Sequence, residues 1–154
     1  MPSTYSQILY QIVFATYLRQ YTMDKETRGR LFAYLAKILE NKRCHVYQIN
    51  GVEDHIHIVV YLHPSVSLAS LVKDIKLSAS QFIKKENLFK GWKGWQNGYA
   101  AFTYSQDAKM NLVNYVKRQE KHHSASYEKR ETYREELIRL LKEHNIPFKE
   151  EYLD

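Results

Sequence analysis

Two histidines one residue apart, His55 and His57, lie in an aliphatic run, His-Ile-His-Ile-Val-Val, that is typical of a β-strand. Side chains alternate between the two faces of a strand, so both imidazoles share one face while Ile56 and Ile58 share the other. Neutral imidazole nitrogens bind divalent metals, and this spacing allows both rings to hold one ion. The spacing alone is also compatible with ordinary solvent-facing histidines.

A second group of chemically capable residues falls near residue 115. Tyr115 and Gln119 are four residues apart in a run of helical character, so they lie on one helix face. Lys117, Arg118 and Lys121 make the same helix basic. A tyrosine beside an amide oxygen on a basic helix suits attack on a phosphate. An exposed tyrosine on a solvated basic face is the alternative interpretation.

The elements that must position these residues follow from the hydrophobic pattern. Alternating β-branched and aromatic residues predict strands, and apolar residues at spacings of three and four predict helices. Strands are predicted over residues 5–16, 44–50, 55–62 and 99–105, and helices from Asp24 to about Lys42, from Ser67 to about Ile83, from about Asp107 to Lys121, and from about Tyr127 to Glu143.

This order, β-α-β-β-α-β with helices appended at the C-terminal end, predicts an α+β protein with a ferredoxin-like antiparallel sheet. Both crossover helices then cover one face of the sheet. The aliphatic side chains of residues 56, 58 and 60 suit that covered face. We therefore expect His55 and His57 on the opposite, open face, where a substrate would bind.

Length and composition set the class of protein. We expect 154 residues to form one domain, spanning 1–154. The single cysteine, Cys44, excludes an internal disulfide framework. The first twenty residues resemble neither a signal peptide nor a membrane span, so we expect a cytoplasmic protein without membrane contact. A formal charge of +6 favours a polyanionic partner.

Taken together, these motifs resemble one family, the TnpA-type single-tyrosine HUH transposases, small enzymes of insertion sequences that move as single-stranded DNA. HUH denotes histidine, a bulky hydrophobic residue and histidine. The resemblance covers nearly the whole chain. Its motifs are Asp54 with His55-Ile56-His57, the Leu71-Val72-Lys73-Asp74-Ile75-Lys76 helix, Trp95-Gln96-x-Gly98-Tyr99-x-Ala101-Phe102-Thr103-Tyr104-Ser105, Tyr115-Val-x-x-Gln119 and Glu120-x-His122-His123.

The resemblance implies the reaction. Tyr115 would attack a phosphodiester of single-stranded DNA bearing hairpin ends, forming a 5′-phosphotyrosine and a free 3′-hydroxyl without ATP. His55, His57 and Gln119 would bind a divalent metal, Mg²⁺ or Mn²⁺. Family members are homodimers that share active sites between subunits, so a similar dimer is implied. Whether Tyr115 acts in cis or in trans is left open.

Physical chemistry is consistent with a metal. A tyrosine with a pKa of about 10 is roughly one part in a thousand phenolate at pH 7, a deficit of about 4 kcal/mol. A metal on the scissile phosphate can offset several kcal/mol by Lewis-acid polarisation. Six residues are candidates for contacts with the DNA backbone: Lys73, Lys76, Lys84, Lys117, Arg118 and Lys121.

Aromatic residues of the 92–99 loop offer a second kind of DNA contact. Trp92, Trp95 and Tyr99 could stack on unpaired bases. The two tryptophans could equally anchor the loop on the core.

Two other functions remain as alternatives. One is a domesticated HUH nickase that cuts without moving an element. The other is a non-catalytic ferredoxin-like module that binds nucleic acid, which would ignore chelators and a His57→Ala change.

Overall fold

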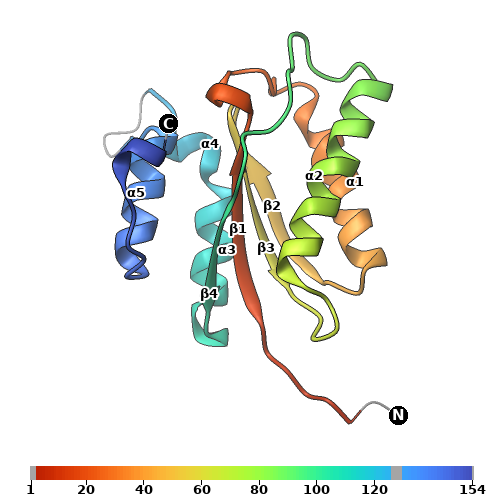
Figure 1. Ribbon diagram of the computed structural model, residues 1–154, viewed down its shortest axis with the longest axis vertical. Helices are drawn as coiled ribbons and strands as arrows, with labels where there is room; N and C mark the ends of the chain where they lie inside the picture. Colours follow the sequence, from red (N-terminus) through yellow and green to blue (C-terminus); the bar gives the residue numbers. More distant parts are fainter. Residues whose placement is uncertain (1–2, 126–129, 154) are drawn as a thin grey trace.

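The computed structural model describes residues 3–125 and 130–153. These residues contain four strands, five α-helices and three short 3₁₀ turns (Figure 1). The elements are β1 (Leu9–Ala15), α1 (Arg28–Asn41), β2 (Val46–Gly51), β3 (His55–Tyr61), α2 (Leu68–Lys85), β4 (Ala100–Tyr104), α3 (Lys109–Lys117), α4 (Gln119–His122) and α5 (Tyr133–Glu143), with 3₁₀ turns at Tyr17–Arg19, Gln106–Ala108 and Glu150–Tyr152.

The sheet has the predicted topology. Its strand order is β2-β3-β1-β4, and every neighbouring pair is antiparallel. The α+β, ferredoxin-like prediction is therefore confirmed. Register places Ala15 opposite His55 and Val13 opposite His57. The histidines thus sit on β3, one of the two central strands.

Helices α1 and α2 cover one face of the sheet, as Figure 1 shows. The aliphatic side chains of β1 and β3 that point to this face are fully buried against both helices. Ser67 caps α2, because its hydroxyl accepts a hydrogen bond from the backbone N–H of Ser70. This layer holds the larger apolar cluster and supports the sheet from behind.

The opposite face is also covered, which corrects the expectation of an open face. Two smaller apolar clusters join it to α3 and α5, and His55 and His57 are 0% exposed. The physical reason is that the C-terminal helices are amphipathic. Leu137, Leu140 and Leu141 of α5 pack against the sheet around Val13. The appended helices therefore form a second layer over the histidines.

Helix boundaries differ from prediction at three places. The helix predicted from Asp107 to Lys121 is interrupted at Arg118, which leaves the helical conformation (φ −95°, ψ 17°) between α3 and α4. Helix α1 begins at Arg28, because Asp24 accepts hydrogen bonds from the backbone and hydroxyl of Thr27 in a preceding turn.

Helix α5 also begins later than predicted, at Tyr133. Thr132 and Glu135 form a reciprocal capping box there, which satisfies the first backbone N–H groups of the helix. The predicted start at Tyr127 lies outside the described residues. Among the helices of residues 3–125 and 130–153, none has the length and apolar character needed to cross a bilayer.

Candidate active site

Both histidines of β3 are oriented by neighbouring oxygen atoms. His55 Nδ1 donates to the Asp54 carboxylate at 2.7 Å, and His57 Nδ1 donates to the side-chain oxygen of Gln11, also at 2.7 Å. Gln11 donates in turn to the hydroxyl of Tyr104 at 2.7 Å. These contacts place the ring hydrogen of each histidine on Nδ1. In the neutral form of each ring, Nε2 is thereby left with a lone pair directed into the site.

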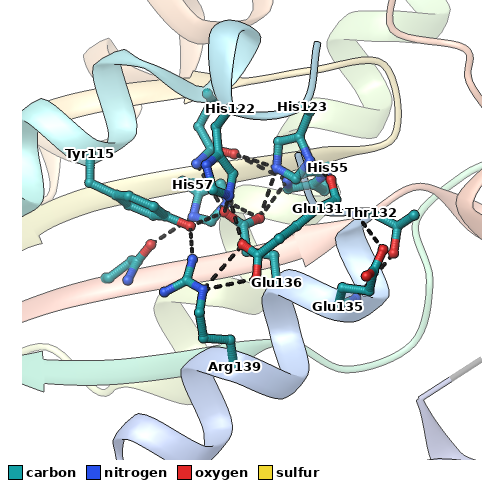
Figure 2. A network of polar contacts seen from close by, with 12 residues as sticks. His55, His57, Tyr115, His122, His123, Glu131, Thr132, Glu135, Glu136 and Arg139 are labelled. Carbon is teal, nitrogen blue, oxygen red and sulfur yellow. Dashed lines mark hydrogen bonds and ion pairs between the residues drawn. The ribbon is translucent and has the colours of Figure 1, made fainter. Parts of the chain in front are cut away.

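A third imidazole has the same arrangement. His123 Nδ1 donates to the backbone carbonyl of Glu131 at 2.6 Å, so its Nε2 also carries a lone pair. All three Nε2 atoms converge on Oε1 of Glu136, at 3.0 Å from His55, 3.0 Å from His57 and 3.1 Å from His123 (Figure 2). Four acceptor atoms at these separations repel one another unless a proton or a cation lies among them.

This donor set fits a divalent metal. Ligand atoms of His55, His57 and Glu136 all lie within 4.8 Å of one another, and so do those of His122, His123 and Glu136. Such a mixture of imidazoles and one carboxylate is the set that first-row transition metals prefer.

Protons can relieve the repulsion among these acceptor atoms. Burial acts to lower the pKa of His55, but its hydrogen bonds with Asp54 and Glu136 outweigh burial and raise the pKa to about 9. Burial lowers the pKa of His57 below its ordinary value. Although burial opposes it, the surrounding imidazoles hold the pKa of Glu136 well below its usual range. At neutral pH these shifts favour a His55 imidazolium beside a Glu136 carboxylate.

Glu136 was not predicted from the sequence. It is 0% exposed and lies on the buried face of α5, between Tyr133 and Leu137 of the apolar stripe. A carboxylate inside an apolar stripe is a usable signal, because an unpaired buried charge is very costly. The sequence could therefore have indicated that Glu136 has partners, although not which ones.

Gln119, predicted from the sequence as a metal ligand, lies beside the histidines and is 0% exposed. Its side-chain oxygen is 3.3 Å from His55 Nε2 and 3.1 Å from His123 Nε2, and its amide donates to Glu136 Oε2 at 3.0 Å. It faces the histidines from α4, just past the helix interruption at Arg118.

Tyr115 approaches the histidines within one chain. Its ring centroid is 6.0 Å from that of His57, and its hydroxyl donates to Oε2 of Glu136 (Figure 2). The same hydroxyl accepts a hydrogen bond from Arg139 Nη2 at 2.7 Å. Burial raises the pKa of Tyr115 above its usual range, the Glu136 charge adds to this, and Arg139 opposes it. One carboxylate thus joins the phenol to the imidazoles.

Tyr115 also faces an open pocket. A cavity of about 350 Å³ is lined by polar and basic residues of α3 and α4 beside the phenol. These residues are Asn111, Asn114, Tyr115, Arg118, Lys121 and His122. Two of the six residues predicted to contact DNA, Arg118 and Lys121, therefore line the pocket beside the phenol. A third, Lys117, is exposed on α3, the helix that carries Tyr115.

The other three predicted DNA contacts lie on α2, on the far side of the sheet from Tyr115. Lys73 and Lys84 are exposed there. Lys76 is half-buried, and its ammonium group donates to the backbone carbonyls of Gln96 and Gly98 at 2.8 and 2.9 Å. Lys76 therefore holds the loop before β4. The structure does not bring these lysines to the phenol.

The two tryptophans of the loop before β4 pack on the core. The ring of Trp95 meets Phe14 edge-on at 4.9 Å, and both tryptophans are partly buried against the main core. They anchor the loop on the core, whereas Tyr99 remains 42% exposed.

Comparisons with known proteins agree on one family. Residues 4–119 match the sequence profile described as "Transposase IS200 like". Two curated relatives, each a transposase for insertion sequence element IS200, come from Salmonella typhimurium strain LT2 and Salmonella typhi. Each is 26% identical over 115 residues, which is 71% of this chain and 75% of the relative.

Solved structures share the fold. A candidate transposase from Deinococcus radiodurans R1 matches with a TM-score of 0.59 and 17% identity, over 77% of this chain and 95% of that one. The REP-associated tyrosine transposase bound to a REP hairpin matches with a TM-score of 0.58 and 15% identity, over 80% of this chain and 73% of that one.

Proposed function

Because the chain belongs to the family of IS200-like transposases, with TnpA-type single-tyrosine members, we propose that it cleaves and rejoins single-stranded DNA through Tyr115. One observation carries the proposal: the phenol of Tyr115 and the imidazoles of His55 and His57 meet at the single carboxylate of Glu136. A nucleophile and a set of metal-binding groups are thus within reach of one phosphate.

The reaction is a transesterification. Tyr115 Oη attacks the phosphorus, the Oη–P bond forms and the bond from phosphorus to the 3′ oxygen breaks. The phenol proton passes to Glu136 Oε2, which already accepts the hydrogen bond, and the same proton is then delivered to the departing 3′ oxygen, which becomes the free 3′-hydroxyl. The product is a 5′-phosphotyrosine. Because the new ester retains the energy of the old one, the 3′-hydroxyl of another strand can reverse the step without ATP.

His55, His57 and Glu136 would hold the metal, with His123 and Gln119 completing the site. When bound, a divalent ion polarises the scissile phosphate and offsets several kcal/mol of the barrier. We propose Mn²⁺ over Mg²⁺, because Mg²⁺ prefers oxygen ligands whereas up to three donors here are imidazole nitrogens. Asp54 and Gln11 would keep the imidazoles in the tautomer that binds the ion.

We propose that the DNA strand enters through the pocket of about 350 Å³ beside Tyr115. Arg118 and Lys121 line this pocket and would contact phosphates, and exposed Lys117 extends the basic surface. A similar protein was solved bound to a REP hairpin. We therefore propose single-stranded DNA with hairpin ends as the substrate of this chain.

We also propose that residues 1–154 form one catalytic domain whose site is complete in cis. Tyr115 and His57 of the same chain are close enough for their rings to meet edge to face. A shared site in a homodimer makes the opposite prediction for mixed variants. Mixing Tyr115→Phe with His57→Ala protein restores cleavage only if subunits exchange these residues, and we expect no restoration.

The central test is capture of the covalent adduct. Wild-type protein is incubated with single-stranded DNA carrying the flanks of its gene and Mn²⁺, then denatured and separated by electrophoresis. We expect a denaturation-resistant adduct that Tyr115→Phe abolishes. Tyr47→Phe is the matched control, because Tyr47 is another half-buried tyrosine beside the same apolar cluster.

The outcomes of this assay separate the remaining functions. An adduct that still forms with Tyr115→Phe shows that the nucleophile is another residue. DNA binding without any adduct, unaffected by chelators and by His57→Ala, would indicate a non-catalytic binding module. Cleavage by a chain whose gene lacks flanking hairpin-forming ends would indicate a domesticated nickase.

A further inference from the structure

Arg139 contacts the same oxygen atom that is proposed to attack the phosphate. It lies on α5, three residues after Glu136. Its Nη2 donates to Tyr115 Oη at 2.7 Å, and its guanidinium carbon is 5.4 Å from the centre of the tyrosine ring (Figure 2). The side chain is 34% exposed, so it reaches the phenol from the solvent side of the site.

The guanidinium is held by carboxylates on its other edges. Nε donates to both oxygens of Glu131, at 3.1 and 3.0 Å, and Nη1 donates to Glu143 at 3.0 Å. A planar guanidinium fixed at two edges has little freedom to rotate. The third edge is therefore aimed at Tyr115 before any DNA arrives.

Charge explains why this contact matters. The phenol is buried next to the Glu136 carboxylate, and both burial and that negative charge disfavour a negative oxygen at Tyr115. Arg139 places a permanent positive charge in hydrogen-bond contact with the same atom. A preorganised donor at a developing negative charge is the arrangement that lowers a reaction barrier.

We infer that Arg139 is a catalytic residue that stabilises negative charge on Tyr115 Oη in both directions of the proposed reaction. During cleavage it stabilises the negative charge that Oη carries once its proton has passed to Glu136 and before the Oη–P bond is complete. During rejoining, a 3′-hydroxyl attacks the phosphotyrosine, the Oη–P bond breaks, and Arg139 stabilises the departing phenolate. This inference rests on the proposed function.

Arg139 lies outside the part of the chain that the family profile matches. The family profile matches residues 4–119, whereas α5 spans Tyr133–Glu143. Arg139 and Glu131, the residue that orients it, therefore both come from the segment beyond the matched region. The C-terminal helix thus adds a catalytic group to the site as well as covering it.

The test measures the single-turnover rate of adduct formation at saturating DNA and Mn²⁺. We expect Arg139→Met to slow the rate by about 100-fold, the usual effect of losing one such donor. DNA affinity, measured by fluorescence anisotropy, should change by less than about threefold, because the strand is bound mainly by many other phosphate contacts. The rate of Arg139→Lys should fall between those of wild type and Arg139→Met, because lysine keeps the positive charge but lacks the planar guanidinium.

Two controls separate catalysis from a structural role. Arg134→Met removes another α5 guanidinium, one that contacts Glu150 at the chain's end, and should leave the rate unchanged. Adding guanidinium chloride to Arg139→Ala should recover part of the lost rate, whereas sodium chloride at equal ionic strength should not. A residue that only supports the fold would not be rescued in this way.

The outcomes are distinguishable. Wild-type rates in Arg139→Met and Arg139→Lys would overturn the inference, and so would a loss of rate that merely follows a loss of DNA binding. If circular dichroism shows that Arg139→Ala does not fold, the rates of Arg139→Lys and Arg139→Met decide whether the inference holds. If wild-type protein forms no adduct at all, the proposed function itself fails.

Discussion

Replacing Glu136 with glutamine tests the charge arrangement of the site. The change keeps the size of the side chain and removes the charge that faces three imidazoles within 3.1 Å. The substitution removes one of the two carboxylates that stabilise the His55 imidazolium in protein without metal. The other carboxylate, Asp54, remains. The glutamine amide cannot balance that positive charge, so we expect the folded state to be destabilised.

The magnitude follows from the pKa of His55. A folded pKa of about 9 in place of 6.5 is worth about 3 kcal/mol of folding stability at and below pH 6.5. The folded pKa is raised, so this stability is lost as pH rises: about 2.5 kcal/mol remain at pH 7 and about 1.4 kcal/mol at pH 8. Glu136 and Asp54 share the effect, so Glu136→Gln should cost between about 1 and 2 kcal/mol at pH 7.

Urea unfolding in the presence of a chelator measures the free energy of unfolding of both proteins at pH 6.5, 7, 8 and 9. The difference between wild type and Glu136→Gln should shrink toward zero at pH 9. Glu26→Gln removes the same charge from an exposed position and is the matched control. A difference that is constant or grows with pH would refute the reasoning, because His55 would then not be held charged by Glu136.

The same variants report on the metal. At pH 7, Mn²⁺ at about 100 times its dissociation constant should stabilise wild-type protein by about 2.7 kcal/mol. Glu136→Gln should gain clearly less at the same concentration, because a neutral amide oxygen is a weaker ligand than a carboxylate. Equal stabilisation of both proteins would show that Glu136 does not bind the ion.

Three further changes probe the supports of the site. Gly51→Ala should destabilise the fold by about 1–3 kcal/mol, measured by thermal unfolding, because the added methyl would overlap the His55 carbonyl. Gln11→Leu should weaken Mn²⁺ binding by about 10–100-fold in calorimetric titration, since His57 Nδ1 loses the acceptor that fixes its tautomer. Lys76→Met should speed hydrogen exchange in residues 91–99 and leave β1 and β3 protected, because it removes two hydrogen bonds to that loop.

The local pattern of the sequence was enough to predict the sheet and the placement of its histidines. Strand alternation alone puts His55 and His57 on one face, because successive side chains of any strand point to opposite sides. The same logic correctly assigned Ile56, Ile58 and Val60 to the face covered by α1 and α2. These features depend on residues that are neighbours in the chain.

Helix boundaries were less predictable than the strands, although α5 begins at a local signal. Thr132 followed three residues later by Glu135 is a capping-box sequence, and it marks the true start of α5. The interruption at Arg118 has no comparable signal, because the buried positions Leu112, Val116 and Gln119 keep helical spacing across it. There, contacts with the rest of the molecule override the helical preference of the segment.

The complete site was decided by tertiary structure. Glu136 lies 81 residues after His55, and Gln11 lies 46 residues before His57, yet each is hydrogen-bonded to that histidine. The sequence predicted a helix in the segment that contains Glu136, and its apolar residues could be buried against any apolar surface. Only the fold, by leaving one face of the sheet uncovered by α1 and α2, directs the Glu136 carboxylate to the two histidines.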